Sequence, residues 1–260
     1  MSKDLSKILK GWDYDPNEVT VRTIRGDDGR EKIQLRMDLG VLQMERDGRP
    51  DGSRPEGCES WLEYYLQRQG AHDEAHPDSA AFQLDEDDCV RLWGEGVQYY
   101  HRYLSFWHLK LYELCARDTQ RNLQLFGFVC EYAKDDRHKL QFDQWRPYVR
   151  MMYTRSVATP LIEKKHYEEA LQVIESGIDA IRDFLDEYQQ SHRVEECAEL
   201  MSLEHWRDEI VLKEQRARAS RPQTAVQILR NKLEAAVAAE EFEEAARLRD
   251  EIRQLSDESV

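Results

Sequence analysis

The sequence lacks both the long apolar runs of a membrane protein and the paired cysteines of a disulfide-linked one. No run approaches the ~18 apolar residues of a membrane span, and the opening stretch MSKDLSKILKGWDYDP has no apolar core like that of a signal peptide. The five cysteines are odd in number and form no CxxC pair, which argues against a disulfide framework or a zinc ribbon. We therefore expect a cytoplasmic protein, with Cys115 and Cys130 acting as small buried hydrophobic residues.

Positively charged residues are outnumbered by negatively charged ones. The 260 residues include 37 Lys and Arg against 52 Asp and Glu, which gives a formal net charge of -15 and a pI of about 5.1. A strongly negative surface repels the phosphate backbone, so direct nucleic-acid binding is not expected as the main role. An acidic protein can still act beside DNA by holding a basic protein partner.

Catalytic signatures are missing as well. The sequence contains no GxxxxGK[ST] phosphate loop, no GxSxG nucleophile motif, no kinase set and no dinucleotide fingerprint. We therefore predict that the chain is not an enzyme and needs no cofactor. The alternative is an enzyme whose site lies in residues 1–215 and carries no recognisable motif.

Two short stretches contain side chains that can bind metal ions, but we interpret neither as a metal site. His72 and His76 stand four residues apart, a spacing that could hold zinc on a helix. However, HDEAH is not HExxH, and it lies next to Pro77 in a stretch that reads as loop. The acidic run 85–88 suits the first turn of a helix, where the dipole favours negative charge.

Aromatic residues gather around His101 and His108. Such a cluster could stack nucleobases. At helical spacing in an acidic protein it is more typical of a core or of a partner groove, and we prefer that interpretation. The aromatic residues are Tyr99, Tyr100, Tyr103, Phe106 and Trp107.

The first 80 residues contain most of the glycine and predict a β-hairpin with loops. Period-2 alternation around Val21 and around Leu35, on either side of a Gly-Asp-Asp-Gly turn, is the strand–turn–strand signal. A Gly/Pro-rich loop follows. The stretch SWLEYYLQRQG then predicts a short helix with Ser60 as N-cap and Gly70 just past its end, followed by a second loop.

From Asp85 onward the pattern is helical, so the fold class is mainly α. One apolar stripe runs through a helix of about five turns. A buried helix follows at NLQLFGFVCEYA, then two helices that meet near His166, then one long helix whose polar end, 216–221, we interpret as a linker. The stripe consists of Val97, Tyr100, Leu104, Trp107, Leu111 and Leu114.

The helix pair around His166 resembles a tetratricopeptide (TPR) hairpin. Its small and apolar residues fall where that repeat packs its two helices, although the 34-residue period does not recur. We prefer an ordinary antiparallel helix pair as the interpretation of this pattern. The matching residues are Val157, Ala158, Leu161, Tyr167, Ala170, Ile174 and Gly177.

The C-terminal stretch 222–257 predicts two short helices joined tightly into an antiparallel hairpin. Pro222 fits the first turn of the first helix, and the second begins at Phe242. Each helix has a single apolar face. A hairpin of about 35 residues cannot bury enough surface to be stable alone, so we expect it to dock. The predicted domains are thus 1–80, 81–215 and 222–257, with the linker between the last two.

The stretch FEEAARLRDEIRQL resembles the UVR motif, the C-terminal hairpin of the excision-repair proteins UvrB and UvrC, which also occurs in ClpC and McsA. The family pattern is matched in order over this hairpin, although the body has neither a phosphate loop nor CxxC pairs nor a recognisable nuclease motif. A generic coiled coil would also be rich in Ala, Glu and Arg. The matching residues are Leu233, Ala236, Val237, Phe242, Glu243, Ala245, Ala246, Leu248, Arg249, Asp250 and Ile252.

The resemblance implies protein–protein docking, onto a UVR hairpin of a UvrB/UvrC-like or ClpC-like partner or onto a second copy of the chain. Phe242 would be the central apolar contact, and Arg249 and Asp250 would set pairing and register. The chain would then be a non-enzymatic adaptor in DNA repair or, alternatively, in chaperone–protease quality control. The candidate partner-binding residues are Leu229, Leu233, Val237, Phe242, Ala245, Ala246, Arg249, Asp250 and Ile252.

Overall fold

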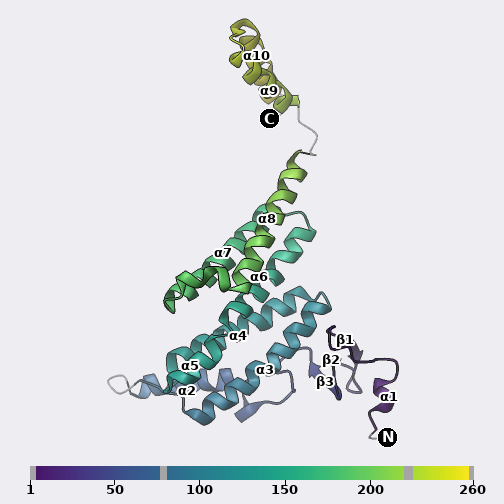
Figure 1. Cartoon of the computed structure of the whole chain (residues 1–260), viewed down its shortest axis with the longest axis vertical. Helices are drawn as coiled ribbons and strands as arrows, with labels where there is room; N and C mark the ends of the chain where they lie inside the picture. Colours follow the sequence, from purple (N-terminus) through teal and green to yellow (C-terminus); the bar gives the residue numbers. More distant parts are fainter. Residues whose placement is uncertain (1–3, 77–80, 220–224, 258–260) are drawn as a thin grey trace. The chain divides into compact units, whose positions relative to one another are not determined.

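The computed structural model describes residues 4–76, 81–219 and 225–257 (Figure 1). The chain forms two compact units, Met1–Val211 and Leu212–Val260. The first, called the body below, combines a small sheet with a set of helices, and the second contains a helical hairpin. The mainly α fold class is confirmed. No helix among the described residues is both long enough and apolar enough to cross a bilayer.

The N-terminal sheet is antiparallel and three-stranded, in the order β1-β2-β3. Its strands are β1 (Val21–Arg25), β2 (Glu31–Met37) and β3 (Gly40–Glu45), and a short helix α1 (Ser6–Leu9) precedes them. The predicted hairpin is β1–β2, with Gly29 at φ +75° in its turn. The third strand was missed, because the alternation beyond Leu39 is short and its turn residues carry no Gly-rich signal.

Helix α2 (Trp61–Ala75) begins where the sequence predicts and ends later. The Ser60 side chain accepts a hydrogen bond from the Glu63 backbone N–H at 3.1 Å, as an N-cap should. The predicted end at Gly70 is wrong, since the helix continues through Gly70 to its C-cap at His76 and residues 71–75 of the loop predicted to follow are helical. Gly70 is absent from the glycines with positive φ, so it makes no left-handed turn that would end a helix.

Helices α3 (Glu86–His108) and α4 (Tyr112–Tyr132) replace the single helix predicted across the apolar stripe. The chain breaks at Lys110, which adopts φ 58°. The backbone N–H of Leu111 donates to the Phe106 carbonyl at 2.9 Å, and that of Lys110 to the Trp107 carbonyl at 3.0 Å. This is the Schellman arrangement that closes a helix. The prediction of one helix was wrong because a lysine, not a glycine, occupies the left-handed position.

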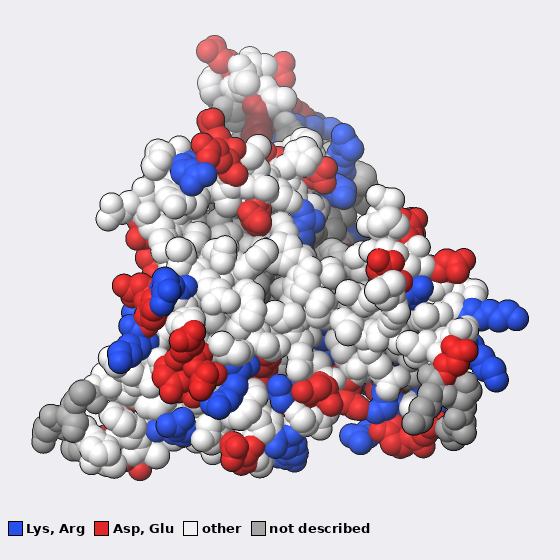
Figure 2. All heavy atoms as spheres, turned by 60° about the horizontal axis from the view of Figure 1, so that its bottom comes forward, with Lys and Arg blue, Asp and Glu red and all other residues white. Residues whose placement is uncertain are grey.

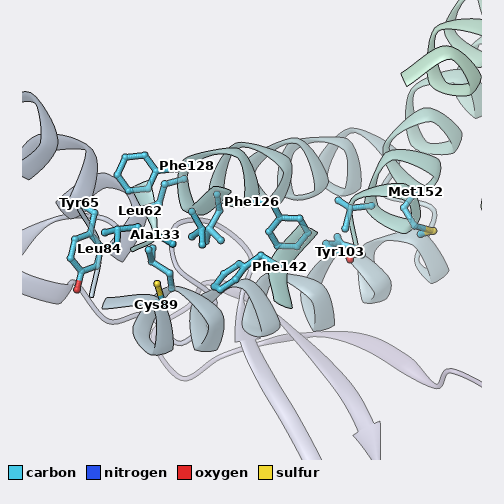
Figure 3. Packing of buried hydrophobic residues seen from close by; sticks show 14 of the residues in the cluster. Leu62, Tyr65, Leu84, Cys89, Tyr103, Phe126, Phe128, Ala133, Phe142 and Met152 are labelled. Carbon is cyan, nitrogen blue, oxygen red and sulfur yellow. The ribbon is translucent and has the colours of Figure 1, made fainter. Parts of the chain in front are cut away.

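Part of the predicted apolar stripe is not core. Val97 and Tyr100 keep 36% and 37% of their surface exposed. The buried face of α3 instead includes Leu92, Tyr103 and Phe106 (Figure 3 labels Tyr103). On α4 the apolar stretch is buried as predicted, and Phe126 meets Phe142 of α5 (Asp136–Asp143) edge to face at 5.9 Å between ring centres.

Buried ion pairs tie the sheet and its following loop to α3 and α4. Arg102 donates to both carboxylate oxygens of Asp118 at 2.6 and 3.1 Å, and both side chains are 1% exposed. The third nitrogen of Arg102, Nη1, donates to the carbonyls of Glu45 and Gly48 at 3.0 and 2.8 Å. The guanidinium is thus satisfied on every side that faces protein, which is the condition for burying a charge.

The helix pair predicted near His166 is confirmed as α6 (Arg146–Glu163) and α7 (Tyr167–Glu187). Ala158, Ala170 and Ile174 are fully buried between the helices and their neighbours. A side chain at Gly177 would collide with Thr154, so the glycine permits the close approach. The TPR resemblance itself is not confirmed.

Helix α8 (Ala198–Ala219) follows and includes residues 216–219 of the predicted linker. The other linker residues, 220–221, and Pro222 lie outside the described residues. The predicted domain boundaries stay a prediction. On the face drawn in Figure 2, acidic and basic side chains are interspersed around an area without either. Cys115 is fully buried, and Cys130 is half-buried.

Asp118→Ala should lower the free energy of unfolding by about 3–5 kcal/mol, because it leaves the buried Arg102 guanidinium without its counter-ion. Urea denaturation followed by circular dichroism measures the change. Arg137→Ala is the control, since it breaks the ion pair to Asp135 from an 87% exposed side chain and should leave the midpoint almost unchanged. Equal effects of the two substitutions would contradict the proposed role of the buried pair.

Lys165→Gly should raise the free energy of unfolding by about 1 kcal/mol, because Lys165 closes α6 at φ 62° and glycine has no penalty there. Thermal unfolding would detect the gain. Its neighbour Lys164 has φ -82°, so Lys164→Gly only adds freedom to the unfolded chain and should give no gain. A loss at both positions would show that the left-handed residue is not a source of strain.

Candidate functional site

The C-terminal unit folds as the predicted antiparallel hairpin. Helix α9 (Ala225–Ala238) packs along α10 (Phe242–Asp257). The turn between them is another Schellman closure. Glu240 adopts φ 60°, the Glu241 N–H donates to the Ala236 carbonyl at 2.8 Å, and the Glu240 N–H donates to the Val237 carbonyl at 3.1 Å. The chain therefore reverses within three residues, and Phe242 stands at the first position of α10.

The two helices share a small apolar core. Its buried members are Leu229, Ala236, Ala245 and Leu248, each no more than 9% exposed. Leu233 and Ile252 pack against this core and are half-buried. The alanines allow the backbones to approach closely. Four candidate partner-binding residues, Leu229, Leu233, Ala245 and Ile252, thus contribute to contacts within the hairpin.

The remaining apolar candidates face outward. Phe242 is 69% exposed, Val237 is 53% exposed, and Ala246 is exposed as well. Ile228, which the sequence reasoning did not select, is 41% exposed. Its position one residue before the stripe residue Leu229 was the only signal that could have identified it. The side chains of Val226 and Leu255 lie outside the described residues.

Arg249 and Asp250 are both exposed and are bound to each other. The Arg249 Nε and one of its terminal nitrogens donate to Asp250 Oδ1 at 3.2 and 3.1 Å. The two side chains are 71% and 65% exposed, so the pair contributes little to the hairpin's own stability. Both groups can therefore exchange this contact for one with a partner at small cost.

Acidic residues surround Phe242. Glu240, Glu241, Glu243 and Glu244 are all exposed, and the first turn of α10 favours the charge of Glu243 and Glu244 through the helix dipole. Arg247, on the next turn, pairs with Glu244 at 3.5 Å. The hairpin thus presents an exposed aromatic ring within a ring of carboxylates, an arrangement that suits an apolar pocket with a basic rim.

The other groups selected from the sequence have local structural roles. The rings of His72 and His76 stack at 4.9 Å. Asp85 and Asp88 form a capping box at the start of α3. Among the described residues, no set of three His, Cys, Asp or Glu side chains is arranged to hold a metal ion. His101 is half-buried in the body, and burial lowers its pKa.

A comparison with models of protein families matches residues 228–258 to the UvrB/UvrC (UVR) motif. The match covers the hairpin and leaves the body unassigned. Neither the curated proteins nor the solved structures contain a match to this chain. The chain therefore carries a UVR motif, which mediates protein–protein interactions, on a body without a known counterpart in these comparisons.

Leu248→Asp should unfold the hairpin, because it places a charge in a core where Leu248 is 6% exposed. Hydrogen exchange of the full chain would then show lost protection in residues 225–257 and unchanged protection in the body. Val237→Asp is the control on the same hairpin, since Val237 is 53% exposed, and it should leave protection intact. Protection retained in Leu248→Asp would contradict the described pairing of α9 and α10.

Proposed function

We propose that this chain is a non-enzymatic, cytoplasmic adaptor that docks a protein partner through its UVR hairpin. The observation that carries the proposal is the exposure of Phe242, 69% of whose surface is open at the head of α10, whereas Leu229 and Leu248 are buried in the core of the hairpin. An aromatic ring of this size stabilises an interface when a partner covers it.

A second hairpin in the same chain supports this interpretation. The α6–α7 turn has the same closure, and α7 begins with Tyr167-Glu168-Glu169-Ala170 as α10 begins with Phe242-Glu243-Glu244-Ala245. Tyr167 is half-buried against the apolar core of the body, and Ala170 is fully buried. Phe242, the equivalent residue of the UVR hairpin, is not packed in this way within its own unit. We therefore infer that a partner supplies the apolar contact.

The acidic surroundings of Phe242 favour a partner whose docking pocket has a basic rim. A UVR-type hairpin of a UvrB/UvrC-like protein is the partner we propose, which places the adaptor beside excision repair of DNA. A ClpC-like partner in protein quality control and a second copy of this chain are the alternative occupants. Each would engage the exposed residues Val237, Phe242 and Ala246 while leaving the internal core of the hairpin intact.

The test uses the full chain as bait in a lysate of its source cell, in parallel with Phe242→Asp and with Leu140→Asp. Phe242→Asp should reduce recovery of the partner by at least about tenfold, because it places a charge in the apolar contact. Leu140 is 55% exposed on α5, so Leu140→Asp controls for the effect of an added surface charge and should recover the partner fully.

Each outcome of this experiment has a defined meaning. Loss of excision-repair proteins in Phe242→Asp alone supports the repair adaptor. Loss of a chaperone–protease replaces repair with quality control. Loss of a concentration-dependent dimer in sedimentation replaces both with self-association. Equal recovery by all three baits would contradict docking through Phe242.

A further inference from the structure

The body contains a cavity of about 420 Å³ between α3, α4 and α6. Its walls are mainly aromatic. Small-molecule sites in proteins range over roughly 300–1,000 Å³ and are lined mostly by apolar groups. The aromatic lining residues are Trp93, Tyr100, Tyr103, Phe126, Trp145 and Tyr148.

The rings of this cavity are held against one another by contacts that fix its shape. Tyr100 meets Tyr103 edge to face at 5.6 Å between ring centres, and it meets Tyr148 in a tilted arrangement at 6.4 Å. The Asn122 amide donates to the Gly96 carbonyl at 2.9 Å, which ties α4 to α3 at the cavity wall. A preformed aromatic site of this kind loses little conformational freedom when it binds.

The mouth of the cavity explains the exposed part of the predicted apolar stripe. Val97, Tyr100 and Trp145 line the cavity and keep 36%, 37% and 48% of their surface exposed. These side chains are therefore partly exposed because they lie at the mouth of the cavity. They form the accessible side of a site whose inner wall includes Tyr103 and Phe126.

The lining is uncharged at neutral pH. No Lys, Arg, Asp or Glu is among the residues that line it. Burial raises the pKa of Tyr148 to about 12 and that of Tyr103 further, so both phenols stay protonated. Burial also lowers the pKa of His101, so its ring is neutral. A charged ligand would lose its hydration here without gaining a counter-ion.

Tyr103 brings a phenol hydroxyl to the lining. Tyr103 is 1% exposed, and its hydroxyl has no hydrogen-bond partner among the described residues, whereas buried Tyr65 donates to Asp88 at 2.6 Å. Buried phenol hydroxyls normally have a partner. An acceptor atom on a bound molecule would give the Tyr103 hydroxyl a hydrogen-bond partner.

We propose that this cavity binds an uncharged aromatic small molecule of one or two rings that accepts a hydrogen bond from Tyr103. Its rings would pack edge to face and offset against Tyr100, Trp93 and Phe126, the geometry that aromatic pairs prefer. None of the residues that line the cavity belongs to the UVR hairpin. This proposal is therefore tested separately from the proposed adaptor function.

The test is isothermal titration of the full chain with three probes at neutral pH. Quinoline is neutral with an acceptor nitrogen, naphthalene is neutral without one, and N-methylquinolinium has the same ring size with a positive charge. Quinoline should bind at least about tenfold more tightly than N-methylquinolinium. Tighter binding of the cation would overturn the assignment of an uncharged ligand, as would no binding of quinoline at millimolar concentration.

Variants locate the binding. Val97→Glu places a charge at the mouth and should weaken quinoline binding by about tenfold. Val90→Glu is the control on the same helix, since Val90 is 61% exposed and does not line the cavity. Tyr103→Phe should weaken quinoline about fivefold and leave naphthalene unchanged. Equal affinity in all three variants would place the binding elsewhere and overturn the proposal.

Discussion

Two carboxylates buried among the helices hold the body of this protein together. Asp118 neutralises Arg102, which in turn binds the carbonyls at the end of β3. Glu95, fully buried on α3, accepts hydrogen bonds from the backbone N–H groups of Trp61 and Leu62 at 2.8 and 3.1 Å, which satisfies the first turn of α2. It also pairs with Arg121 of α4. The sheet, α2, α3 and α4 are thus connected by buried charges. Removal of one partner would leave the other charge buried and unpaired, which is strongly destabilising.

The same type of turn ends three of the helices. Lys110, Lys165 and Glu240 each adopt positive φ and close a helix, and the next helix begins two residues later at Tyr112, Tyr167 or Phe242. A non-glycine residue in this conformation is strained by about 1–2 kcal/mol, so packing of the following helices must offset the strain. In α3–α4 and α6–α7 that packing lies within the body. In α9–α10 the hairpin's own small core supplies such packing.

Sequence reasoning predicted the features that depend on local pattern and missed those that depend on distant partners. Ser60, the acidic start of α3, the β1–β2 turn and the UVR hairpin all have short-range signals, and the structure contains them. The break at Lys110 had none, because no glycine marks it. The burial of Glu95 and Arg102 could not be seen either, since each depends on residues tens of positions away. At the hairpin, spacing identified an apolar face but could not separate Leu248, which is internal, from Phe242, which is exposed.

The difference between the internal residue Leu248 and the exposed residue Phe242 connects the structure to the proposed function. A helix pair with one apolar face uses that face to hold its two helices together, so it has little left for a partner unless some residues lie off the seam. Leu229, Ala236, Ala245 and Leu248 form the seam. Phe242 lies off it at the turn, where carboxylates would repel another acidic surface and attract a basic one. Under the proposed docking function, the seam residues would stabilise the hairpin and the turn would recognise the partner. We therefore expect substitutions in the seam and substitutions at the turn to affect stability and docking separately.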